Sequence, residues 1–157
     1  MNRSMARPLP RDPRPHRSLG ASVRTGLVFG TVAAAINCLI WLIARGIGVP
    51  TTVFTVADDQ LDTSLTPLIV IAATLFASLV AGLFVGLLSR SVSHAVRWII
   101  VCGALFTLAS LSAPLNRPEA ITTATRVILV IMHVVTGVVV TAGLARGIWT
   151  DDRAVRT

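Results

Sequence analysis

The second apolar stretch of the chain decides its fold: residues 68–89 read LIVIAATLFASLVAGLFVGLLS and contain no Asp, Glu, Lys or Arg. At about 1.5 Å of rise per residue, such a helix reaches roughly 33 Å, close to the thickness of the hydrocarbon core of a bilayer. Three more uncharged stretches of similar length surround it, at residues 26–44, 98–115 and 127–145. The sequence therefore predicts an all-α membrane protein, a bundle of four transmembrane helices.

The composition excludes an ordinary soluble fold. Of the 157 residues, 54% are hydrophobic and 13% are charged, whereas a soluble domain has about 25% charged residues. We divide the chain into a disordered head rich in Arg and Pro (1–24), a membrane domain (25–147) and a short tail (148–157). The first apolar stretch exceeds the core of a signal peptide, about 7–15 residues, so we expect it to be retained.

The basic residues, all arginine, indicate the orientation in the membrane. One side of the predicted bundle carries most of them: Arg3, Arg7, Arg11, Arg14, Arg17, Arg24, Arg90, Arg97, Arg146, Arg153 and Arg156. The other side carries Arg45, Arg117 and Arg126. The positive-inside rule then places both termini in the cytoplasm, as expected of a multi-pass protein of a bacterial plasma membrane.

The arginine-rich head has two interpretations. It can bind anionic lipid, at on the order of 1 kcal/mol per Arg near the surface, or its charge only fixes the topology. No basic helix or aromatic-studded sheet is predicted that would read bases, so we do not expect nucleic acid as a partner.

The connections between the stretches predict local features. Residues 51–56 (TTVFTV) are rich in β-branched side chains and favour a short strand in the first outer loop. Thr66 followed by Pro67 is typical of a helix start, and Thr122 or Thr123 can cap the last helix. The short connection over residues 90–97 predicts that the second and third helices are antiparallel neighbours.

The outer loop also contains an acidic motif, Asp58-Asp59-x-x-Asp62. Isoprenoid-processing enzymes hold magnesium and diphosphate with this pattern, but they need a second acidic motif and a large helical cavity. The sequence predicts neither, so we interpret the motif as an acidic outer loop. No nucleophile–base arrangement or cofactor motif is evident, and we expect neither an enzyme nor a bound cofactor or metal.

Small residues recur at four-residue spacing in the second stretch: Ser78, Gly82 and Gly86. Lipid gives membrane helices little hydrophobic reason to associate, so close approach at small residues matters. This stripe predicts either packing inside the bundle or homo-oligomerisation. Comparable small residues lie in the first stretch (Gly26, Gly30) and the fourth (Gly137, Thr141).

His133 is the only imidazole inside a span, and Asn37 lies at a similar predicted depth. An ionisable residue within a membrane is a candidate functional group. One interpretation is a hydrogen bond between the two side chains, which satisfies both where no water is present. The other is a role for His133 toward a ligand or proton. A metal is disfavoured because no second His or carboxylate accompanies it.

Several motifs together carry a family resemblance, which runs from about Val23 to Arg146. They are Asn37 with Trp41 and Gly48-Val49, the run LFASLVAG at 75–82, the run LASLSAP at 108–114, and Met132-His133. With these the chain resembles the small actinobacterial four-helix membrane proteins catalogued only as a domain of unknown function. The resemblance implies a four-helix topology and no particular activity.

Two functions remain open from the sequence. The first is a non-enzymatic structural or accessory membrane protein whose loop 46–66 meets a partner. The alternative is a small-molecule or ion-handling protein with a polar site at His133 and Asn37.

Overall fold

The computed structural model describes residues 18–50, 52–54, 62–92, 94–115 and 122–154, with side chains on all of these except 52–54, 62–64 and 149–154. Its long helices are α1 (Leu19–Gly46), α2 (Pro67–Ser91), α3 (Ala95–Ser110) and α5 (Thr123–Ala154). Four helical segments, with α3 continued by a short α4, are long and apolar enough to cross a membrane. The predicted four-helix architecture is thus confirmed, and the chain is a multi-pass membrane protein.

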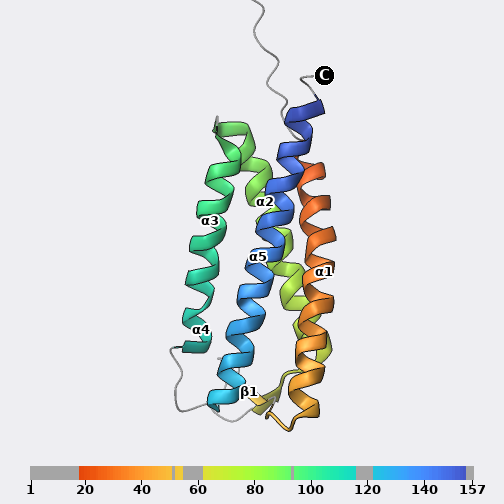
Figure 1. The fold of residues 1–157 in the computed structure, drawn as a ribbon, viewed down its shortest axis with the longest axis vertical. Coiled ribbons are helices and arrows are strands. Elements are labelled where there is room, and N and C mark those ends of the chain that lie inside the picture. Colours follow the sequence, from red (N-terminus) through yellow and green to blue (C-terminus); the bar gives the residue numbers. More distant parts are fainter. Residues whose placement is uncertain (1–17, 51, 55–61, 93, 116–121, 155–157) are drawn as a thin grey trace, which may run out of the picture.

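The helices run alternately up and down (Figure 1), so α1 begins and α5 ends at the same end of the bundle. We call this the arginine end, because Arg24, Arg90, Arg97 and Arg146 lie toward it. The opposite end carries two short strands and is called the hairpin end.

Two predicted boundaries differ from the structure. The head was expected to reach residue 24, but α1 begins at Leu19, where the Ser18 hydroxyl caps it by accepting from the Ala21 amide (3.2 Å). The tail was expected from residue 148, but α5 continues to Ala154. Helix α1 therefore begins before its apolar stretch, and α5 ends after its own. Polar residues can continue a helix outside the hydrocarbon region. Residues 1–17, and with them the predicted lipid-binding head, lie outside the described part of the chain.

The third predicted span is interrupted near its end. Helix α3 ends at Ser110, and a single turn, α4 (Ser112–Leu115), follows after Leu111. Pro114 explains the break: it has no N–H to donate to the carbonyl of Ser110, and its ring crowds that carbonyl. The predicted span 98–115 lies within the spanning segment Ala95–Leu115, which the structure divides into α3 and α4.

The caps predicted for α2 and α5 are confirmed. The Thr66 hydroxyl accepts from the Ile69 amide (3.4 Å) with Pro67 directly after it, and the Thr122 hydroxyl accepts from the Thr125 amide (3.2 Å). At the end of α1 the chain turns through Gly48, whose φ of 80° lies in the left-handed region that favours glycine.

The first outer connection contains an antiparallel pair of strands, β1 (Thr52–Phe54) and β2 (Asp62–Ser64). In their register Thr52 faces Ser64 and Phe54 faces Asp62. Strand β1 falls within the stretch rich in β-branched residues. Asp58 and Asp59 of the acidic motif lie outside the described residues.

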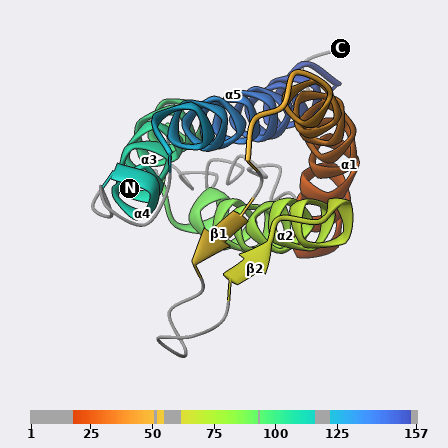
Figure 2. The ribbon, with the colours of Figure 1, turned by 90° about the horizontal axis from the view of Figure 1, so that it is seen from below.

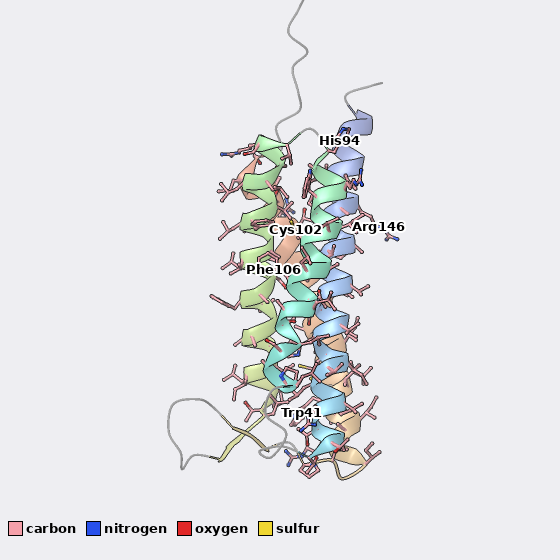
Figure 3. All side chains as sticks on the ribbon, turned by 90° about the vertical axis from the view of Figure 1, so that its left-hand side faces the viewer. Trp41, His94, Cys102, Phe106 and Arg146 are labelled. Atoms are coloured by element: carbon pink, nitrogen blue, oxygen red, sulfur yellow. The ribbon has the colours of Figure 1, made fainter. Side chains whose placement is uncertain are left out.

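Two hydrogen bonds fasten this connection to the bundle. The indole N–H of Trp41 donates to the carbonyl of Leu65 (2.7 Å), and the hydroxyl of Thr125 donates to the carbonyl of Pro50 (2.6 Å). The guanidinium of Arg45 also lies over the Trp41 ring, 5.5 Å from its centroid. The connection is therefore tied to α1 and α5 at the hairpin end, where Figure 3 shows Trp41.

We predict that Trp41→Phe lowers the free energy of unfolding by about 1 kcal/mol, because it removes the donor to Leu65. Trp98→Phe is the matched control, since the Trp98 ring is 49% exposed and forms no hydrogen bond with any described residue. The measurement is reversible unfolding by SDS in mixed micelles. Equal effects of the two variants would show that the Trp41 hydrogen bond contributes nothing.

The helices pack in the order α2, α1, α5, α3, as the view along the bundle shows (Figure 2). Helix α1 lies between α2 and α5, and α3 rests mainly on α5. Helices α2 and α3 are antiparallel, as their short connection predicts, but they make few contacts with each other. They meet at Phe84 and Phe106, but the main packing partner of α2 is α1, and that of α3 is α5.

Candidate functional site

A cavity of about 500 Å³ lies between α2, α3 and α5, with one residue of α1, Asn37, also lining it. This volume falls in the range of small-molecule sites, roughly 300–1,000 Å³. The cavity follows from the packing order, because α2 and α3 pack weakly against each other and leave a space between them. It corrects our expectation that the chain has no helical cavity.

The body of the cavity is apolar. Aromatic and aliphatic side chains of α2 and α3 form its walls, among them Phe76, Val80, Phe84 and Phe106. The rings of Phe84 and Phe106 meet edge to face across the gap, with centroids 5.7 Å apart. Figure 3 shows Phe106 and Cys102 on the side of α3 that faces α2.

The cavity opens between α2 and α3. Two of its lining residues on these helices are largely exposed, Phe76 at 69% and Phe106 at 62%. In a bilayer this side of the bundle faces lipid, so the opening leads to the hydrocarbon region. Toward the arginine end the cavity borders a packed cluster from all four long helices: Ala33, Val85, Ile99, Val140, Leu144 and Ile148.

Polar side chains gather in the part of the cavity nearer the hairpin end. The Asn37 amide nitrogen donates to the hydroxyl of Thr74 (3.2 Å) and to that of Thr136 (2.8 Å), which joins α1 to α2 and α5. Asn37 is 2% exposed, and its amide oxygen has no hydrogen-bond partner. Leaving a buried acceptor without a hydrogen bond costs about 1–3 kcal/mol of stability. A donor that reached the Asn37 amide oxygen would therefore stabilise the site.

His133 also lines the cavity. Its Nδ1 lies 2.7 Å from the carbonyl oxygen of Leu129, one helical turn earlier. A carbonyl oxygen only accepts, so Nδ1 carries the hydrogen and donates it. In the neutral ring Nε2 is then the acceptor.

The predicted hydrogen bond between Asn37 and His133 is wrong. The two residues line one cavity, but Asn37 donates to the threonine hydroxyls and His133 donates to its own helix. A backbone carbonyl one turn back is always within reach of a helical side chain. The sequence placed both residues at one depth but could not give the direction in which each side chain leaves its helix.

The stripe of Ser78, Gly82 and Gly86 lies against α1 of the same chain. All three residues are buried. A Cβ atom added to Gly82 would lie 3.0 Å from the Ser22 carbonyl oxygen. Since the stripe is covered within one chain, it offers no free surface for the alternative interpretation, homo-oligomerisation through these residues.

Other candidate groups do not assemble into a site among the described residues. In that part of the chain no group of three or more His, Cys, Asp or Glu lies close enough together to hold a metal. Cys38 and Cys102 are free thiols.

Sequence reasoning missed the cavity itself. The available signal was the small residues Ala73, Ala77 and Ala81, spaced four apart on α2, which line the cavity instead of filling it. Such a stripe is equally typical of close helix packing, so the sequence does not distinguish the two.

Comparison with known proteins supplies a family. The sequence model of DUF6069, a family of unknown function, matches residues 17–149. This range includes α1 to α4, most of α5 and all residues that line the cavity. No curated protein and no solved structure matches the chain. Because the match covers most of the sequence, the chain belongs to DUF6069, a family of unknown function.

Proposed function

We propose that this protein is a non-enzymatic membrane protein that binds a small, largely apolar molecule in the cavity between α2, α3 and α5. The observation that carries the proposal is the cavity itself: about 500 Å³, apolar along most of its length and open between two helices. A hollow of this size, lined mainly by apolar side chains, is typical of sites that bind small molecules.

The opening favours a molecule that arrives through the bilayer. Exposed Phe76 and Phe106 border it, and both lie within the apolar spans. A ligand dissolved in lipid reaches the cavity without crossing a polar barrier. Of the two functions that the sequence left open, this supports the small-molecule alternative, with Asn37 and His133 at its polar end.

The orientation belongs to the same proposal. Arg24, Arg90, Arg97 and Arg146 lie toward one end of the bundle, which supports both termini in the cytoplasm of a bacterial cell. The accessory role, with a partner at loop 46–66, stays a prediction, since the centre of that loop lies outside the described residues.

The proposal is tested by photolabelling in phosphatidylcholine nanodiscs with a long-chain alkyl methyl ether that carries a diazirine. We expect labelled peptides from α2, α3 and α5. The double variant Ala77→Phe/Ala81→Phe fills the cavity and should lower labelling on the order of tenfold. Ala72→Phe is the matched control, because Ala72 is exposed on the same helix and does not line the cavity. Equal labelling of both variants would overturn the proposal.

A further inference from the structure

The polar part of the cavity has a definite hydrogen-bonding character. The Thr136 hydroxyl donates to the carbonyl of Met132 (2.9 Å), so toward Asn37 it can only accept. The Asn37 amide must therefore turn its nitrogen to Thr136 and keep its oxygen free. This fixes the unpaired group in the site as an acceptor, the Asn37 Oδ1 atom.

His133 adds a second acceptor. Its Nδ1–H is engaged by Leu129, and no described residue donates to Nε2. Thr74 contributes one donor, since its hydroxyl accepts from Asn37 and no described acceptor takes its hydrogen. Two acceptors and one hydroxyl hydrogen thus remain for a ligand, which suits a group that both donates and accepts.

No residue that lines the cavity carries a permanent charge. The residues that line the cavity include no Asp, Glu, Lys or Arg. A charged headgroup brought to Asn37 would lose its water and find no carboxylate, guanidinium or ammonium group among the lining residues, which is unfavourable in a low-dielectric setting. The lining therefore favours a neutral head over a phosphate, carboxylate or ammonium head.

We propose that the ligand is a neutral long-chain alcohol or phenol whose hydroxyl donates to Asn37 Oδ1 and accepts from Thr74, while its hydrocarbon lies along the apolar body between α2 and α3. This inference rests on the proposed function and specifies the head of the molecule that the cavity binds. A hydroxyl is the smallest neutral group that meets both requirements of the site. An ether oxygen offers no hydrogen to Oδ1.

The test compares two diazirine probes of equal chain length, a long-chain alcohol and its methyl ether, in phosphatidylcholine nanodiscs. We expect the alcohol to label the wild-type protein about five- to tenfold more efficiently at equal concentration, the gain of one hydrogen bond to an otherwise unpaired group. In Asn37→Leu the ratio of alcohol to ether labelling should fall to about one, because the group that distinguishes the two heads is gone. His133→Phe should lower alcohol labelling less, because Nε2 is only an additional acceptor.

A third probe, the alkylammonium of the same chain, tests the requirement for a neutral head, and stronger labelling by it would overturn the proposal. Equal labelling by alcohol and ether would also overturn it, as expected if a water molecule satisfies Asn37. Asn37→Leu is used only if its SDS unfolding matches that of the wild type. If it does not, Asn37→Gln replaces it. This variant keeps an amide on a longer side chain, and we expect it to change the ratio of alcohol to ether labelling.

The two proposals fail differently. If the cavity binds apolar molecules without regard to the head, Ala77→Phe/Ala81→Phe lowers labelling by both probes on the order of tenfold, while Asn37→Leu leaves the ratio of the two probes unchanged. If the cavity binds nothing, the double variant has no effect on either probe.

Discussion

Gly26→Ala is expected to lower the free energy of unfolding by about 1–3 kcal/mol, although it adds a single methyl group. A Cβ atom at this position would lie 2.8 Å from the Ser78 carbonyl oxygen and 3.1 Å from the Gly82 Cα atom. Both are backbone atoms of α2, which cannot rotate out of the way. The methyl group therefore forces α1 and α2 apart along their whole contact.

Gly20→Ala is the matched control, because it is the same substitution on the same helix. No atom lies within 4 Å of a Cβ added at Gly20, and alanine favours a helix over glycine by up to about 1 kcal/mol. We expect this variant to be as stable as the wild type or slightly more so. SDS unfolding of both variants measures the difference. If Gly26→Ala is as stable as Gly20→Ala, the close approach of α1 and α2 is wrong.

The α1–α2 contact shows which features of the fold can be predicted from the sequence and which cannot. The lack of charge over 68–89 was enough to predict a spanning helix, because a bilayer admits few alternatives. The small residues Ser78, Gly82 and Gly86 also indicated a packing face. Which helix covers that face depends on the matching small residues across the contact, here Gly26 and Gly30 of α1. Spacing within one helix carries no information about its partner.

The polar end of the cavity shows where sequence reasoning stops. Depth along a helix follows from counting residues, and Asn37 and His133 do share one cavity. Their hydrogen-bond partners depend on rotation about the helix axis and on nearby competitors. Thr74 and Thr136 are such competitors, and neither stood out in the sequence because threonine is common in membrane helices. For the same reason the sequence did not predict the packing order of the helices, and it therefore did not predict the cavity.

Gly137→Ala is expected to weaken the attachment of α3 to the bundle. Helix α3 rests mainly on α5, and two reciprocal contacts join them: Gly103 faces Thr141, and Gly137 faces Thr107. A Cβ atom at Gly137 would overlap the Thr107 hydroxyl. That side chain is held by its own hydrogen bond to the Gly103 carbonyl (2.8 Å), so rotating it away breaks the bond.

We expect Gly137→Ala to cost about 1–3 kcal/mol in SDS unfolding and to weaken labelling of the cavity, because α3 forms one of its walls. The control changes Thr107, the residue that Gly137 contacts. Thr107→Gly alone removes the hydroxyl and lowers helix propensity by only about 0.3 kcal/mol. In the double variant the new methyl group occupies the space that Thr107 leaves, since glycine and side chain have exchanged helices.

The double variant should therefore be more stable than the sum of the two single changes predicts, by about 1 kcal/mol or more. It should also recover ether labelling of the cavity, which a general loss of stability cannot explain. Strictly additive effects would mean that α3 does not approach α5 at Gly137. The cavity would then lack its third wall, and the proposed binding site would have to lie elsewhere in the bundle.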